Sequence, residues 1–348
     1  MIKRKLLCIM LLFFTLCGCQ SKEDSGHIYL YGELHDRPLI KEEEFKIWKE
    51  YYQEGMRHLF IEKPYYTAMY LNEWIKAEDD DILLNWLVGD WGSSFSASDA
   101  SIDFYLSIKK ECPETIFHGT DVGHQYKTTG QRYLNMLESQ NKQDSMEYKE
   151  TLRCIQQGKE YYASLDMNVR EQMMYENFIR EYQNILGEDI MGIYGLAHVI
   201  DCGNLDGSVD YMGKALQNHY QEDKVHHHDL TQYGYVSKPI NQLEIIINDK
   251  IYQMDDYGIK EVYNSNQKMR FYHIKDAYDD LKNLEKIEDC YPTQDFLMQT
   301  TLHEIYMIEY ILENNQKNYT FFMTDGSIWE GLDVAVAINM KGIEYEIR

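Results

Sequence analysis

Four short apolar segments each end in a group of polar residues that can take part in chemistry. They are rich in Ile, Leu, Phe and Tyr and cover residues 27–31, 58–61, 115–118 and 190–194. Such runs are typical of buried β-strands. Helical patterns lie between them, as where Phe45, Trp48 and Tyr52 repeat at i, i+3 and i+7. Alternating strands and helices predict an α/β fold with a mainly parallel sheet flanked by helices.

The pattern changes near residue 233. Two β-hairpins are predicted beyond it, around the turns Asn248-Asp249 and Asp325-Gly326. Their expected strands cover 243–247, 251–252, 319–323 and 327–329. One hydrophobic core rarely serves a chain of this length. We therefore expect an α/β domain over residues 27–232 and an appended, smaller α+β unit over residues 233–348.

The N-terminus has the pattern of an export signal. Lys3, Arg4 and Lys5 precede an apolar run of eleven residues, which is too short for a transmembrane helix of about 20 residues. It ends in Leu16-Cys17-Gly18-Cys19, which resembles the lipobox of bacterial lipoproteins. The resemblance implies a signal peptide over 1–18, acylation of Cys19 and a tether over 19–26. The protein would then be exported and anchored to the cell membrane, facing outside the cytoplasm. The alternative is a secreted protein cleaved nearby.

Charge and cysteine content exclude several classes of function. The formal net charge of −24 becomes −27 once residues 1–18, which hold three basic and no acidic residues, are removed. An acidic chain of this kind lacks the basic face that nucleic acid requires. We expect its partners to be membrane lipid, through Cys19, and a small-molecule or peptide ligand. Four cysteines follow Cys19, namely Cys112, Cys154, Cys202 and Cys290, and they form no Cys-x-x-Cys pair. Neither a disulfide framework nor a zinc ribbon is therefore predicted. One disulfide could form among them, and the sequence leaves its pairing open.

The polar groups at the strand ends are the candidate site. In open α/β sheets, ligands bind at the carboxyl ends of the strands. Glu33 and His35 are two residues apart, so in extended backbone they project to the same side. A carboxylate beside an imidazole fixes its tautomer and suits a general base acting on water, although the pair could also bind a metal. The other residues expected at these ends are Asp36, Glu62, Asp121, His124 and His198.

These other residues have several possible roles. His198 is a second base or a second metal ligand beside His35, and Glu62 adds a carboxylate. Asp36, Asp121 and His124 would contact the substrate or support those that do. Taken singly, each of these residues is more often a solvated loop residue, and only their occurrence on four strands favours a site.

Arg170 begins the pattern Arg170-Glu171-x-x-Met174-x-x-Asn177, whose positions 170, 174 and 177 share one face of a helix. A guanidinium there could hold a substrate carboxylate or stabilise an oxyanion, with Asn177 in support. It could equally form an ion pair with Glu33 or Glu62, and the two roles are compatible.

These motifs resemble the erythromycin esterase, ChaN and Tiki superfamily over residues 27–200. The resemblance rests on Gly32-Glu33-Leu34-His35-Asp36-x-Pro38, Glu62, the Arg170 pattern and Gly195-x-x-His198, in that order along the chain. It implies the α/β fold of that superfamily. Its members include esterases with the first-motif His as base, metal-dependent proteases with two Gly-x-x-His motifs, and haem-binding lipoproteins. The last third of the chain resembles no member.

Two functions therefore stay open at the sequence level. In the first, His35 oriented by Glu33 activates a water that is either free or bound to a metal held by His35 and His198, and this water hydrolyses an ester or amide bond. Glu62, Arg170 and His198 complete the site. In the second, the same cleft of a surface lipoprotein binds haem or a divalent metal without turnover. A third reading, an interaction module without chemistry, is disfavoured by the intact site residues. No serine nucleophile elbow, phosphate loop or dinucleotide fingerprint is present. His226-His227-His228 is expected to be an exposed run in a polar loop.

Overall fold

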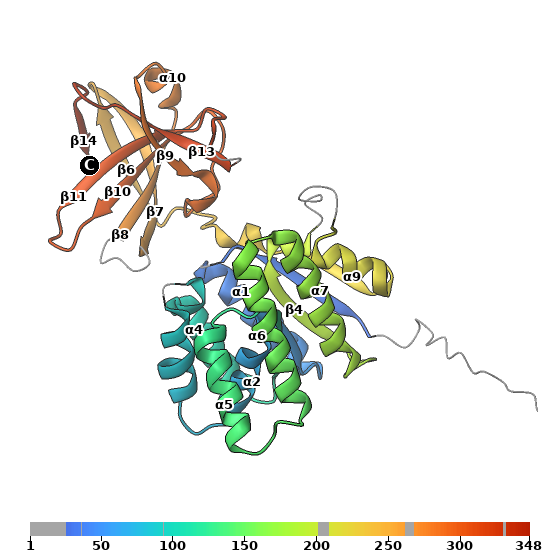
Figure 1. Cartoon of the computed structure of the whole chain (residues 1–348). Coiled ribbons are helices and arrows are strands. Elements are labelled where there is room, and N and C mark those ends of the chain that lie inside the picture. Colours follow the sequence, from blue (N-terminus) through green and yellow to red (C-terminus); the bar gives the residue numbers. More distant parts are fainter. Residues whose placement is uncertain (1–25, 36, 93, 201–208, 262–267, 330–331) are drawn as a thin grey trace, which may run out of the picture.

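The computed structural model describes residues 26–348 except 36, 93, 201–208, 262–267 and 330–331. It contains a mixed α/β unit around a five-stranded parallel sheet and a separate, curled antiparallel sheet (Figure 1). Cys19 and the predicted signal peptide and tether up to residue 25 lie outside the described residues. Among the described residues, no helix combines the length and the apolar character that crossing a bilayer requires.

The parallel sheet has the strand order β3-β2-β4-β1-β5. The four strands predicted from the apolar segments are confirmed: β1 (Ile28–Glu33), β2 (His58–Pro64), β3 (Ile116–Asp121) and β4 (Ile190–Gly195). Because alternate residues of a strand point to opposite faces, Leu59 and Ile61 join one buried cluster and Phe60 joins another. The sheet is therefore covered on both faces.

Helices supply the two covering layers. The first helix, α1, begins with Pro38 at its first turn and buries Ile40, Glu44 and Trp48, spaced four residues apart. The helix α7 is capped by the Asp166 side chain, which accepts from the Asn168 N–H. The helices of this unit are α1 (Pro38–Gln53), α2 (Tyr65–Trp74), α3 (Val88–Trp91), α4 (Asp99–Glu111), α5 (Gln131–Ser139), α6 (Met146–Ser164), α7 (Met167–Gln183), α8 (Leu196–Val199) and α9 (Met212–Tyr220), with π-helical turns at Ile82–Leu87 and Tyr126–Gly130.

The histidine run 226–228 is not a loop, as its polarity suggested, but part of the fifth parallel strand, β5 (Val225–Asp229). This strand pairs with β1 at the edge of the sheet. Rings rather than aliphatic side chains stabilise the pairing, because His226 stacks on Tyr29 and His228 stacks on Tyr31. A search for aliphatic strand residues misses such a strand.

The second unit is mainly antiparallel β, with little of the helix expected for an α+β unit; its described helical segments are α10 (Tyr278–Leu281) and a 3₁₀ turn, Thr293–Asp295. The first predicted hairpin is confirmed, and Asn248 and Asp249 form its turn with positive φ of 46° and 65°. The strands are β6 (Asn241–Ile247), β7 (Lys250–Glu261), β8 (Lys268–Ile274), β9 (Lys286–Pro292), β10 (Ile305–Ile311), β11 (Lys317–Met323), β12 (Ile328–Trp329), β13 (Leu332–Ile338) and β14 (Tyr345–Ile347).

The second predicted hairpin is wrong. The strand β11 does not pair with β12 across Asp325-Gly326; it pairs with β10 and β13, while β12 pairs with β13. The chain does not reverse at Asp325-Gly326 either, because β11 and β12 both run antiparallel to β13 and therefore run in the same direction. The partner of a strand is chosen by the whole sheet rather than by a turn signal alone.

Candidate active site

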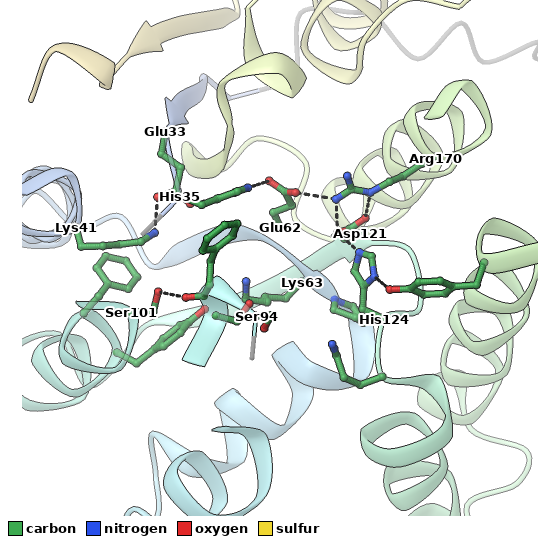
Figure 2. Close-up of a pocket in the computed structure, with 17 residues that line it drawn as sticks. Glu33, His35, Lys41, Glu62, Lys63, Ser94, Ser101, Asp121, His124 and Arg170 are labelled. Carbon is green, nitrogen blue, oxygen red and sulfur yellow. Dashed lines mark hydrogen bonds and ion pairs between the residues drawn. The ribbon is translucent and has the colours of Figure 1, made fainter. Parts of the chain in front are cut away.

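A cavity of about 300 Å³ opens at the carboxyl ends of β1, β2 and β3, where the sequence predicted the site. Figure 2 shows its acidic and basic side chains converging from elements that are far apart in the chain. Acidic, basic, hydroxyl and aromatic side chains all contribute to its walls. The lining residues are Glu33, His35, Lys41, Glu62, Lys63, Pro64, Ser94, Phe95, Ser96, Ser101, Phe104, Tyr105, Asp121, His124, Gln125, Tyr162 and Arg170.

His35 lines this cavity, and its two ring nitrogens have different surroundings. It follows β1, and its Nδ1–H donates to Glu33 Oε1 at 2.9 Å, which leaves Nε2 as the acceptor of the neutral ring. Nε2 lies 3.9 Å from Glu62 Oε2, beyond hydrogen-bond distance. The side chain is 40% exposed and its ring stacks on that of Phe95. Burial lowers the pKa of His35, but the hydrogen bond to Glu33 and the charge of Glu62 outweigh it, so the pKa is raised.

A buried cluster below His35 fixes the charge of Glu33. Lys41 Nζ lies 2.5 Å from Glu33 Oε2 and 2.9 Å from Glu44 Oε2. Burial alone would raise the pKa of Glu33, yet Lys41 and His35 hold it well below its usual range. Burial and the neighbouring Glu33 raise the pKa of Glu44 instead. The cluster therefore favours the ionised form of Glu33, which orients His35, and the neutral form of Glu44.

Arg170 holds two of the predicted carboxylates together. Its Nη2 donates to Glu62 Oε1 and to Asp121 Oδ2, both at 2.7 Å, and its Nε donates to Asp121 Oδ1 at 3.0 Å. The expected ion pair with Glu62 is thus present, and a bidentate pair with Asp121 is added. Burial would raise the pKa of both carboxyls, but charged neighbours outweigh it. His198, His35 and Arg170 lower the pKa of Glu62. Arg170 and His124 lower the pKa of Asp121. The Gly195 N–H donates to the other oxygen of Glu62.

His198 lies behind this cluster and does not line the cavity. It is 6% exposed; its Nδ1 bonds to Glu171 Oε1 at 2.5 Å and its Nε2 lies 3.4 Å from Glu62 Oε1. Burial lowers its pKa, but the two carboxylates together raise it to about 10. The two carboxylates thus favour the protonated form of His198, which positions Glu62, and this does not suit the expected role as a second base.

The structure places two of the three remaining predicted residues, one at the cavity and one away from it. His124 lines the cavity and bridges Asp121 Oδ2, at 2.9 Å, and the Tyr162 hydroxyl, at 2.6 Å. Asn177 is buried away from the cavity, where its amide donates to the Thr120 carbonyl at the end of β3. Asp36 lies outside the described residues.

The arrangement does not fit the metal site that His35 and His198 were expected to form. Both ring nitrogens of His198 lie against carboxylates, and Arg170 Nη1 lies 3.4 Å from Nε2, so neither nitrogen is open to a metal. Among the described residues, no group of three or more His, Cys, Asp or Glu side chains is placed to hold a metal ion.

Sequence reasoning missed several residues of the site: most of them line the cavity, whereas Glu171 lies behind it, against His198. Glu171 stood in the Arg170 motif but was given no role, and Lys63 follows Glu62 directly, so neighbouring positions were the available signal. Lys41, Ser94 and Phe95 carried no signal, because they come from a helix and a loop that only the fold brings to the strand ends.

Comparisons with known proteins name no family. No family model matches the chain, and no curated protein matches its sequence. Among solved structures, it is similar to a Bacillus cereus protein, with 14% identity, a TM-score of 0.39, and coverage of 64% of this chain and 68% of the other. It is also similar to a protein titled succinoglycan biosynthesis protein, with 12% identity, a TM-score of 0.40, and coverage of 59% and 65%. At these values neither similarity assigns a family or a function.

Proposed function

We propose that this protein is a hydrolase that uses His35 as a general base to activate water against an ester or amide bond. One observation carries the proposal: His35 lines a cavity of about 300 Å³, its Nδ1 is fixed by Glu33, and its Nε2 lies 3.9 Å from Glu62 Oε2, beyond hydrogen-bond distance. A base held by one nitrogen and free at the other is the arrangement that proton abstraction from water requires.

The reaction balances without a covalent intermediate. His35 Nε2 removes a proton from water as the water oxygen bonds to the carbonyl carbon, and Glu33 stabilises the imidazolium that forms. When the carbon–oxygen or carbon–nitrogen bond of the tetrahedral intermediate breaks, His35 returns the proton to the leaving group. Arg170 lines the cavity, and we assign it the stabilisation of the developing oxyanion, in addition to holding Glu62 and Asp121.

The finer assignment rests on the sequence motifs. The order of Gly32-Glu33-Leu34-His35, Glu62, the Arg170 pattern and Gly195-Leu196-Ala197-His198 supports an erythromycin-esterase-like hydrolase. The lipobox-like segment supports an exported protein anchored through Cys19, and a Cys19→Ala variant that stays in the membrane fraction would contradict that part.

The test compares His35→Gln with the native protein on 4-nitrophenyl butyrate. General-base catalysis contributes about 10²–10⁴-fold, so we expect kcat/KM to fall by about that factor. The matched control is His228→Gln, which removes an exposed imidazole on β5 and should keep its rate. Circular dichroism checks that both variants fold. A His35→Gln rate equal to that of the native protein would overturn the mechanism. No turnover of any ester or anilide by the native protein would overturn the function.

A further inference from the structure

The cationic side chains at the cavity differ in how they are paired. Lys41 pairs with Glu33 and Glu44, and Arg170 pairs with Glu62 and Asp121. Lys63 also lines the cavity, but its ammonium forms no ion pair or hydrogen bond with any part of the chain that the structure describes. The ammonium lies over the Trp91 ring, 5.9 Å from the ring centroid. Each of these carboxylates therefore has a close cationic partner, whereas the Lys63 ammonium has no carboxylate within ion-pair distance among the described residues.

The surroundings of Lys63 make this lack of a partner costly. It is half-buried at the end of β2, and burial lowers its pKa, while Glu62 and other carboxylates further off partly offset the effect. A charge that is removed from water without a close counter-ion is unfavourable. A ligand anion would supply that missing counter-ion.

A second polar group in the same cavity also lacks a partner. Ser94 Oγ is buried, and it has no hydrogen-bond partner among the described residues. Buried hydroxyls are nearly always satisfied, so this one calls for a partner that the structure does not contain: a water, an ion or an atom of a ligand. The neighbouring turn is held by the Ser101 hydroxyl, which donates to the Phe95 carbonyl at 3.1 Å. Figure 2 shows Lys63, Ser94 and Ser101 among the side chains that line the cavity.

We propose that Lys63 and Ser94 bind an anionic group of the substrate, a carboxylate or a phosphate, so that the enzyme prefers acidic esters or amides. The proposal rests on the hydrolytic function above and names its substrate class. Lys63 supplies the charge, and Ser94 supplies a hydroxyl donor. Phe95, which is 55% exposed and stacks on His35, offers an apolar wall for the uncharged part of the substrate.

The overall charge of the protein makes this preference easy to recognise. A chain with a formal net charge of −24 repels anions at long range. Any preference for an anionic substrate must therefore come from a local cation, and it should survive when salt screens the long-range field.

The first experiment compares two esters with the same leaving group, mono-4-nitrophenyl succinate and 4-nitrophenyl butyrate. We expect the native protein to prefer the succinate ester at least 10-fold in kcat/KM, mainly through KM. Lys63→Met should lower that ratio about 10-fold and Ser94→Ala about 3-fold, whereas Lys63→Arg should keep most of it. Lys149→Met, which removes an exposed lysine, is the charge-matched control and should leave the ratio unchanged.

A pH profile distinguishes a binding role from a merely structural one. The charge of Lys63 lowers the pKa of His35. Because the base must be neutral, Lys63→Met should move the rising limb of kcat/KM to higher pH for both esters. An unchanged ratio in Lys63→Met, or no preference in the native protein, overturns the inference.

A binding experiment separates this inference from the proposed function. Reductive methylation of native protein, read by mass spectrometry, should be slowed at least 5-fold at Lys63 by succinate or by inorganic phosphate, but not at Lys149; the two anions distinguish carboxylate from phosphate. Protection without turnover of any ester would overturn the hydrolase and keep the anion site. Turnover with neither protection nor preference would overturn the anion site alone.

Discussion

At the scale of single residues, two histidines in similar motifs have opposite roles. His35 and His198 each end a Gly-x-x-His sequence. His35 is partly exposed and bonds to one carboxylate, so its Nε2 stays available. His198 is buried between Glu171 and Glu62. Environment rather than motif decides which imidazole can act as a base, and the sequence gives no measure of it.

The charge on His198 predicts a pH-dependent stability. Its pKa of about 10 in the folded state lies above the value of about 6.5 in an unfolded chain. The stabilisation is therefore complete below pH 6.5 and is lost as pH rises towards 10. We expect the free energy of unfolding to fall by about 1 kcal/mol per pH unit between pH 7 and 10. Urea unfolding at several pH values measures this slope.

His198→Gln should lower stability at pH 7 by about 3–5 kcal/mol, because Glu171 and Glu62 lose a buried cation. The same variant should flatten the slope between pH 7 and 10. His228→Gln is again the control and should keep the slope of the native protein. An equally steep slope in His198→Gln would show that another group titrates.

At the scale of elements, the junction between β4 and α8 places the backbone against the site. A Cβ added at Gly195 would lie 3.2 Å from His35 Nε2 and 3.4 Å from Glu62 Oε2. Its φ of −53° and ψ of 141° suit any residue, so glycine is required here by space rather than by backbone conformation.

Gly195→Ala should therefore reduce ester hydrolysis while leaving the protein folded. We expect a loss of kcat/KM of about 3–10-fold, because the His35 ring must shift by a few tenths of an ångström, whereas a displacement of about 1 Å at a catalytic group can cost about 10²-fold. The matched control is Gly89→Ala in α3, where an added Cβ meets nothing within 4 Å and where alanine favours the helix. Activity assays and melting temperatures of both variants test this. Equal activity of Gly195→Ala and the native protein would show that His35 Nε2 is not the working atom.

The strands and site residues of this protein differ in how far the sequence alone could predict them. The strands β1 to β4 were predictable because buried parallel strands are continuous apolar runs. The strand β5 was not, since its stability comes from histidine and tyrosine rings facing those of β1. Likewise Glu33 and His35 were found as strand-end neighbours, whereas Lys41 and Ser94 reach the cavity only through the packing of α1 and of the loop before α4.

At the scale of the whole molecule, each sheet has its own hydrophobic core. The buried clusters of the α/β unit and those of the antiparallel unit share no residue. One described contact between the units joins the buried Arg37, at the start of α1, to Asp295 at 3.0 Å and to the Gln294 carbonyl. Separate cores linked by few polar contacts predict that the units unfold separately.

The tryptophans allow this to be measured, because Trp48, Trp74, Trp86 and Trp91 belong to the α/β unit and only Trp329 to the antiparallel unit. Trp329 is half-exposed, so its emission changes little on unfolding. Tryptophan fluorescence therefore follows one unit, whereas far-ultraviolet circular dichroism follows both. We expect the two urea transitions not to coincide, and Arg37→Met, which removes the linking charge, should separate their midpoints further. Coincident transitions in both proteins would mean that the two sheets form one cooperative unit.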